Sequence, residues 1–178
     1  MLRTSASGAS AIPVARAERL GYRWGVVFVL RETLEIEAPV ARVWEVIADL
    51  DRYPEWNPFV VAVRSSLEVG APIVMRVRVL PFFAQPQRET VLECIPERRL
   101  CYGVEGIPLN ALRSFRYHEL RPEGPERTHY CSHFELDGWL APLTRALLGG
   151  RLERGFEAAT RALKERAELL QRESRGEA

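Results

Sequence analysis

The chain has 178 residues, of which 47% are hydrophobic and 28% are charged. This length and composition favour one folded domain with a hydrophobic core and exclude a mainly disordered chain. The formal net charge of +1 gives no overall field that would attract nucleic acid or an acidic membrane, so we expect no nucleic-acid partner.

Cysteine use and hydropathy predict a cytoplasmic protein without an integral membrane segment. Cys94, Cys101 and Cys131 are odd in number and form no CxxC motif, which argues against a disulfide framework. The most apolar run, residues 24–30, is far shorter than the about 20 residues that span a bilayer.

We predict three parts along the chain. Residues 1–20 are rich in Ser, Ala and Gly and form a flexible N-terminal arm, residues 21–172 form a single domain, and residues 173–178 form a flexible tail. The domain begins with a strand over residues 22–36, where β-branched and aromatic residues are frequent.

A short helix is predicted directly after this strand. The apolar residues that follow Pro39 recur at the spacing of one helical face: Val40, Val43, Trp44 and Ile47. Asp49 or Asp51 could cap a second short helical turn.

A corner rich in aromatic residues and prolines follows, formed by Tyr53, Pro54, Trp56, Pro58 and Phe59. A proline disfavours the helical conformation in the residue before it, so Tyr53 and Asn57 are predicted to be extended. The corner should therefore be stiff.

Residues 59–137 show the signals of strands and hairpins. Six strands are predicted, over residues 59–70, 72–80, 88–96, 100–106, 111–120 and 127–137, and the stretch PFFAQPQ at 81–87 is predicted to interrupt them. With the first strand the total is seven, and the short connections favour antiparallel pairing.

The last segment, residues 141–172, predicts one amphipathic helix of roughly 30 residues and about 45 Å. Such a helix buries its apolar stripe by packing across the concave face of the sheet. Gly149, Gly150 and Gly155 interrupt the stripe. Their small size could leave room for a ligand, or Gly149 and Gly150 could mark a kink or an early break.

Two stretches carry a resemblance to a known family. One is GWLAPL at residues 138–143, and the other comprises Ile36, Ala38, Pro39, Val43, Trp44, Ile47, Asp49, Tyr53, Trp56, Asn57 and Pro58. Together with the order of the elements, they resemble the SRPBCC superfamily, also called START-like or helix-grip proteins, and within it the polyketide cyclase/dehydrase-like branch.

The resemblance covers roughly residues 26–170 and implies an α+β helix-grip fold. This fold has a seven-stranded curved antiparallel sheet, two short helices after the first strand and a long C-terminal helix packed across the concave face. It also implies that Tyr53 and Trp56 brace the short helices and face an internal cavity, although both could serve only as core packing.

One strand offers a candidate metal site. His129, Cys131 and His133 share a face at alternate positions, and a His-x-Cys-x-His set could hold a metal. The opposite face, with residues such as Tyr130 and Phe134, is more apolar and should point inward. The three ligands would then lie outside, so we expect no metal.

The preceding strand offers candidate polar residues for the cavity. Ser114, Arg116 and His118 share a face with Leu120, which predicts that they point inward. A buried arginine is unfavourable unless it is paired or faces water or an anionic ligand. A strand shifted by one residue would instead send all three outward.

We therefore predict a protein that binds a small hydrophobic molecule, such as a lipid, a polyketide-like compound or an isoprenoid, without a cofactor. The cavity should have the about 300–1,000 Å³ that is typical of ligand sites. The predicted ligand-binding residues are Tyr53, Trp56, Ile73, Met75, Val77, Tyr102, Ser114, Arg116, His118, Tyr130, Phe134, Phe156, Ala159 and Leu163. A homodimer is compatible with the sequence.

Two alternatives remain open. A cyclase or dehydratase could use the same cavity, with His118 as base, Arg116 stabilising an enolate and Tyr130 as proton donor. An assembly or interaction module is the other, as a resemblance to one of the subunits of carbon monoxide dehydrogenase would allow. The apolar loops at 81–83 and 106–109 fit that role, and they fit a gate over the cavity equally well.

Overall fold

The computed structural model describes residues 28–104 and 108–176. The expected N-terminal arm and the first part of the expected first strand lie outside these ranges. The elements are, in chain order, β1 (Phe28–Ile36), α2 (Val40–Ala48), the 3-10 helix η1 (Leu50–Arg52), α3 (Tyr53–Trp56), β2 (Val60–Arg64), β3 (Pro72–Leu80), β4 (Phe83–Ile95), β5 (Arg99–Val104), the 3-10 helix η2 (Pro108–Asn110), β6 (Arg113–Pro122), β7 (Thr128–Asp137) and α4 (Ala141–Arg175).

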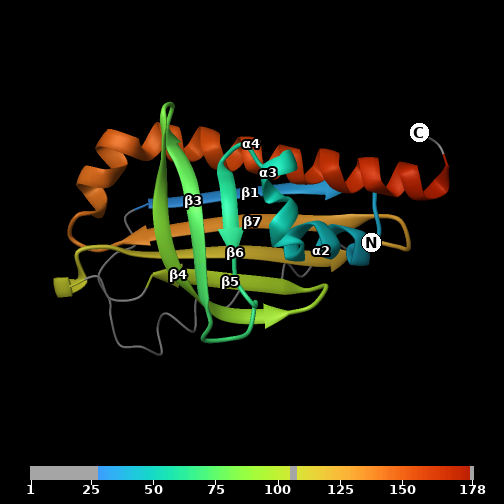
Figure 1. The fold of residues 1–178 in the computed structure, drawn as a ribbon, viewed down its shortest axis with the longest axis horizontal. Helices are drawn as coiled ribbons and strands as arrows, with labels where there is room; N and C mark the ends of the chain where they lie inside the picture. The colour runs from blue at the N-terminus through green and yellow to red at the C-terminus, as the bar shows by residue number, and fades with distance from the viewer. Residues whose placement is uncertain (1–27, 105–107, 177–178) are drawn as a thin grey trace, which may run out of the picture.

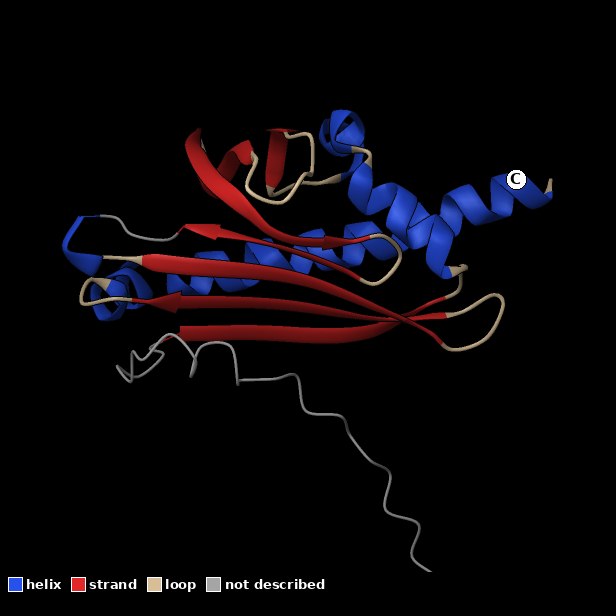
Figure 2. Ribbon diagram, turned by 90° about the horizontal axis from the view of Figure 1, so that it is seen from below, coloured by secondary structure: helices blue, strands red, loops and turns tan. Residues whose placement is uncertain are grey.

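The seven strands form one sheet in the order β1-β7-β6-β5-β4-β3-β2, and all neighbouring strands are antiparallel. The sheet is strongly curved, and α4 lies along its concave side (Figures 1 and 2). The helices α2 and α3 lie close to α4, and α3 also contacts β2. The predicted α+β helix-grip fold is therefore confirmed.

The long helix α4 is not broken at its glycines, since it continues from Ala141 to Arg175. Its first turns, orange in Figure 1, run at an angle to the rest of the helix. The helix also extends three residues beyond the expected end at 172, so that part of the expected tail is helical. Gly176 then ends it in the left-handed conformation, with φ of 71°.

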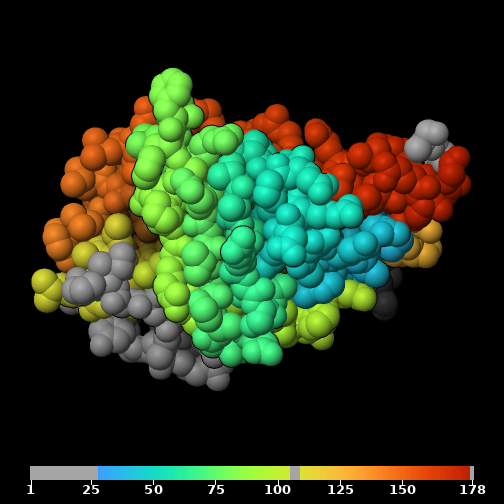
Figure 3. Space-filling model, viewed as in Figure 1, coloured from blue at the N-terminus to red at the C-terminus, as the bar shows by residue number. Residues whose placement is uncertain are grey.

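Strand β4 begins earlier than the sequence predicted. Residues 83–87 belong to the strand, whereas the stretch 81–87 was expected to interrupt the sheet. Pro86 pairs with Arg76 of β3, and β5 pairs only with residues 90–95 of β4. Pro86 therefore occupies an edge position, where a proline is tolerated. The resulting β3–β4 hairpin projects from the molecule (Figure 3).

The conformation of the corner was predicted correctly at one of two positions. Tyr53 is helical, with φ of −53° and ψ of −40°, because it begins α3 and Pro54 occupies the first turn, where a proline is accepted. Asn57 is extended, as predicted, with φ of −91° and ψ of 110°. Its side-chain oxygen accepts hydrogen bonds from the amides of Phe59 and Val60, which fixes the exit of the corner.

No helix in the described part of the chain is both long and apolar enough to cross a membrane.

The glycines of α4 differ in what surrounds them, which gives a test of the packing. A Cβ atom at position 155 would overlap the ring of Phe59, whereas at position 150 its nearest neighbour would be Nη1 of Arg154 at 3.6 Å. Gly155→Ala should therefore destabilise the fold, because overpacking of about 1–3 kcal/mol exceeds the about 1 kcal/mol that alanine gains in a helix.

The matched variant Gly150→Ala should instead raise the free energy of unfolding by up to about 1 kcal/mol. Denaturant unfolding of both variants measures the difference. If the two substitutions stabilise the fold equally, α4 does not pack closely against the ring of Phe59.

Candidate functional site

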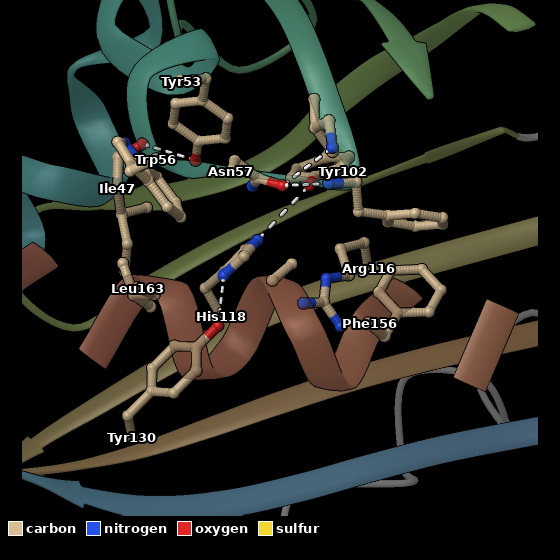
Figure 4. A pocket seen from close by; sticks show the side chains of 13 residues that line it. Ile47, Tyr53, Trp56, Asn57, Tyr102, Arg116, His118, Tyr130, Phe156 and Leu163 are labelled. Atoms are coloured by element: carbon tan, nitrogen blue, oxygen red, sulfur yellow. Dashed lines mark hydrogen bonds between the residues drawn. The ribbon is translucent and has the colours of Figure 1, made fainter. Parts of the chain in front are cut away.

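A small enclosed space lies between α4, the corner and the inner face of β5, β6 and β7 (Figure 4). Its volume is about 30 Å³, which corresponds to about one or two water molecules. The side chains around it are those of Ile47, Tyr53, Trp56, Asn57, Phe59, Val60, Tyr102, Arg116, His118, Tyr130, Phe156, Ala159 and Leu163.

This space is therefore at least ten times smaller than the predicted cavity of about 300–1,000 Å³. Around Gly155, aromatic rings fill the space that the small residues of α4 were expected to leave, whereas beside Gly149 and Gly150 a more open hollow of about 370 Å³ lies between α4 and β1. Phe156 packs against Phe134 and Phe59, with ring centroids 4.6 Å and 5.0 Å apart. Phe59 in turn occupies the position next to Gly155.

The structure brings nine of the predicted ligand-binding residues around this space: Tyr53, Trp56, Tyr102, Arg116, His118, Tyr130, Phe156, Ala159 and Leu163. Ile73, Met75 and Val77 are instead buried in the hydrophobic core, and Phe134 lies behind Phe156. Ser114 is partly buried two residues before Arg116 and does not line the space.

Four lining residues were not predicted: Ile47, Asn57, Phe59 and Val60. All of them come from α2, the corner and β2. Ile47 belongs to the helical stripe, and Phe59 to the aromatic corner, that the sequence analysis did recognise. The proximity of Ile47 and Phe59 to the cavity could have been inferred from those two patterns.

His118 is buried between two tyrosine hydroxyl groups. Its Nδ1 lies 2.7 Å from the hydroxyl of Tyr130, and its Nε2 lies 3.4 Å from that of Tyr102 (Figure 4). Burial, with a further contribution from the Arg116 charge, lowers the pKa of His118 well below its usual value. The imidazole is therefore neutral at neutral pH, so that one ring nitrogen donates a hydrogen bond and the other accepts one.

Both tyrosines are also held in their neutral form. Burial raises the pKa of Tyr130 to about 12, and it raises the pKa of Tyr102 further, while Arg116 acts in the opposite direction on both. The side chains of Tyr102, His118 and Tyr130 thus form a hydrogen-bonded series of neutral groups, in which donor and acceptor roles can be exchanged.

Arg116 supplies the positive charge of the site. Only 6% of its surface is exposed, and its guanidinium carbon lies 4.4 Å from the centre of the Phe156 ring. No carboxylate in the described ranges lies within ion-pair distance of it. The inward direction of Arg116 and His118 agrees with the alternation of β6, and a register shift does not occur.

Glu89 on β4 is an acidic neighbour that the sequence analysis missed. It pairs in register with Ile73, and its partly buried side chain lies on the same inner face. Burial raises its pKa to about 7, and Arg116 lowers it in part. The alternation of Glu89 with buried Val91 was a signal that could have placed this carboxyl inside.

His129, Cys131 and His133 do not form a site together. His129 contacts Glu35 at 2.5 Å, His133 contacts Glu135 at 2.7 Å, and Cys131 is buried. Glu35, Glu123 and His129 do offer ligand atoms within 4.8 Å of one another. Hydrogen bonds with His129 and, to a smaller extent, with Glu123 lower the pKa of Glu35, so hydrogen bonding accounts for this grouping.

Both apolar loops carry exposed apolar side chains. Phe82 is fully exposed, and Phe83 and Leu109 are largely exposed. Residues 106 and 107 of the second loop lie outside the described ranges.

The raised pKa of Glu89 predicts how stability depends on pH. An unfolded glutamate releases its proton near its ordinary pKa of 4.5, whereas the folded protein retains it up to about 7. The contribution of Glu89 to the free energy of unfolding is therefore fully present at low pH and is lost as the pH rises to about 7. Glu89→Gln should be more stable than the wild type by about 1–3 kcal/mol at about pH 8, and equally stable at about pH 4.

The difference between variant and wild type is measured by denaturant unfolding at both pH values. The variant must be compared with the wild type at each pH because His118 has the opposite effect. Its pKa is lowered in the folded protein, so its contribution to the stability of the fold is lost as the pH falls. The exposed Glu68→Gln serves as the control. A pH-independent gain for Glu89→Gln would show that Glu89 ionises normally in the folded protein.

Comparisons with known proteins agree with this geometry. No curated protein matches the sequence. Among solved structures, a START superfamily protein from Mycobacterium smegmatis is 17% identical with a TM-score of 0.62, covering 80% of this chain and 98% of that one. The Zhui aromatase/cyclase from a Streptomyces species is 21% identical with a TM-score of 0.63, covering 79% and 93%.

Norcoclaurine synthase from Thalictrum flavum is 17% identical with a TM-score of 0.57, covering 84% of this chain and 97% of that one. At these identities the likeness establishes the fold alone. A family model described as polyketide cyclase / dehydrase and lipid transport matches residues 28–168. The chain therefore belongs to this polyketide cyclase / dehydrase and lipid transport family.

Proposed function

We propose that the protein binds a small, mainly apolar molecule that carries one anionic or strongly hydrogen-bond-accepting group. The observation that supports this most is Arg116, a buried cation that lines the enclosed space and has no carboxylate partner in the described ranges. A buried charge without an ion-pair partner is unfavourable. Glu89 interacts with Arg116 only beyond ion-pair distance, so an anionic ligand group in contact with the guanidinium would lower the penalty.

The rest of the lining suits the apolar part of such a molecule. Phe59, Phe156 and Leu163 contribute carbon surface, and the polar groups of Tyr102 and His118 lie together on one side. A few convergent polar groups in an apolar wall are typical of sites that orient a small ligand. The family description includes lipid transport, which is in accord with this class of molecule.

Binding requires the space to expand, because about 30 Å³ cannot hold a lipid or polyketide-like compound. The contact between Arg116 and Phe156 is the part of the wall that a ligand would replace. An anion at the guanidinium would compete with the ring for the same charge. The Phe156 side chain could then leave its position against Phe134 and release volume.

A second candidate function is a cyclase or dehydratase reaction in the same space. It is favoured by the neutral His118, which could accept a proton at Nε2, where its contact with Tyr102 is the longer of its two hydrogen bonds. Arg116 would stabilise the enolate, Nδ1–H of His118 would donate a hydrogen bond to the Tyr130 hydroxyl, and the imidazolium would return the proton from Nε2. The Zhui neighbour is an aromatase/cyclase, but a shared fold does not establish a shared reaction.

The role of Arg116 can be tested with two fluorescent probes of similar size. Anilinonaphthalene sulfonate is anionic, and N-phenylnaphthylamine is neutral. Arg116→Met should weaken binding of the anionic probe about 10- to 100-fold, because a charge-assisted hydrogen bond is lost, and should change binding of the neutral probe far less. Arg121→Met, on the same strand but exposed and paired with Glu119, is the control.

Native mass spectrometry of protein purified from its own host would identify a co-purifying compound directly. If Arg116→Met weakens the binding of both probes equally, Arg116 has a structural role only. If the wild type binds neither probe and carries no compound, the binding function itself is wrong.

A further inference from the structure

The outer face of β2, β3 and β4 carries a group of arginines that the proposed function does not use. Its members are Arg64, Arg76, Arg78 and Arg88, and all four are exposed. Arg64 and Arg88 flank Val74 in the register of the sheet, so the arginines form one continuous surface. We call this surface the arginine face.

The charges of the arginine face are not neutralised locally. None of its four arginines forms an ion pair with a residue in the described ranges. Strand β3 contains no acidic residue, and Glu89 of β4 lies on the inner face. A surface with several unpaired arginines is complementary to an anionic partner.

The same strands end in an exposed apolar turn, residues 80–83, which we call the hairpin tip. Leu80 is 39% exposed, Phe82 101% and Phe83 55%. The tip projects from the molecule, as the light green atoms at the top of Figure 3 show. Large apolar side chains that project together into solvent mark an interaction site more often than isolated ones do.

We propose that the hairpin tip and the arginine face together dock the protein on an anionic lipid bilayer. Arg78 lies two residues before Leu80, or about 7 Å along the strand. Arg76 lies four residues before Leu80, or about 13 Å along the strand. Apolar residues of peripheral proteins enter the bilayer surface by about 5–10 Å. With Phe82 and Phe83 at that depth, Arg78 and Arg76 lie at the level of the lipid phosphates.

The position of the aromatic residues favours a bilayer over a nucleic acid. Sheets that bind single-stranded RNA place aromatic rings on the strand face, where bases stack between basic residues. Here the described aromatic residues of this surface, Phe82 and Phe83, lie beyond the arginines at the end of the hairpin. This order along the strand matches the order of acyl chains and phosphates at a membrane surface.

Co-sedimentation with lipid vesicles tests the proposal. The wild type should bind vesicles of equal parts phosphatidylcholine and phosphatidylglycerol, should not bind phosphatidylcholine alone, and should bind more weakly as salt is raised. Arg76→Glu with Arg78→Glu should reduce binding about tenfold or more. Phe82→Ser with Phe83→Ser should also reduce it, although the charge is unchanged.

The control for charge is Arg31→Glu with Arg98→Glu, two exposed arginines outside this surface, which should leave vesicle binding unchanged. Thermal unfolding checks that all variants fold. Absence of wild-type binding to anionic vesicles, or equal loss in the control, would overturn the proposal. Binding of a single-stranded RNA through Arg76 and Arg78, without vesicle binding, would assign the surface to nucleic acid instead.

Discussion

The packing of α4 into the curve of the sheet is the contact on which the rest of this structure depends. A curved seven-stranded sheet has an apolar concave face that only a long amphipathic element can cover. The cover is close because α4 presents Gly155 to the ring of Phe59 and Ala159 to the space beneath. This closeness explains the small volume that remains inside.

The close cover has a chemical consequence for the polar groups beneath it. Tyr102, His118 and Tyr130 lose their water and satisfy one another instead, and their pKa values shift toward the neutral forms for that reason. The guanidinium of Arg116 brings a positive charge into the same environment, where it lies over the Phe156 ring and lowers the pKa values of Tyr102, Tyr130 and Glu89 in part. The interior is therefore poised to accept negative charge.

The sequence predicted the fold because its periodic patterns are strong. The alternation in residues 72–80 and 111–120 and the helical spacing from residue 141 onward depend on local geometry, and the structure reproduces these elements closely. The same alternation placed Arg116 and His118 inside. The stretch 81–87 was predicted to interrupt the sheet, but residues 83–87 belong to β4. Pro86 is tolerated there because of its edge position, which depends on which strands pair with β4, and no local pattern contains that information.

The cavity volume could not be predicted in the same way. It depends on whether Phe59 and Phe156 turn toward or away from the small residues of α4, and this is decided by packing among three separate elements. Glu89 lay inside the predicted strand 88–96, and it was missed because its alternation with buried Val91 was not followed back to residue 89. The arginine face was missed because a net charge of +1 is a sum over the whole surface and says nothing about its distribution.

The distribution of charge separates two kinds of arginine that composition alone cannot distinguish. Arg116 lies on the inner face of the sheet in a medium of low polarity, where a single anion would interact with it strongly and at short range. The arginines of the outer face lie in water, where screening limits each interaction and only several acting together attract a partner. If both proposals hold, the inner site determines which molecule is bound and the outer face determines where the protein docks. Substitutions on opposite faces of the sheet should then change one property without the other.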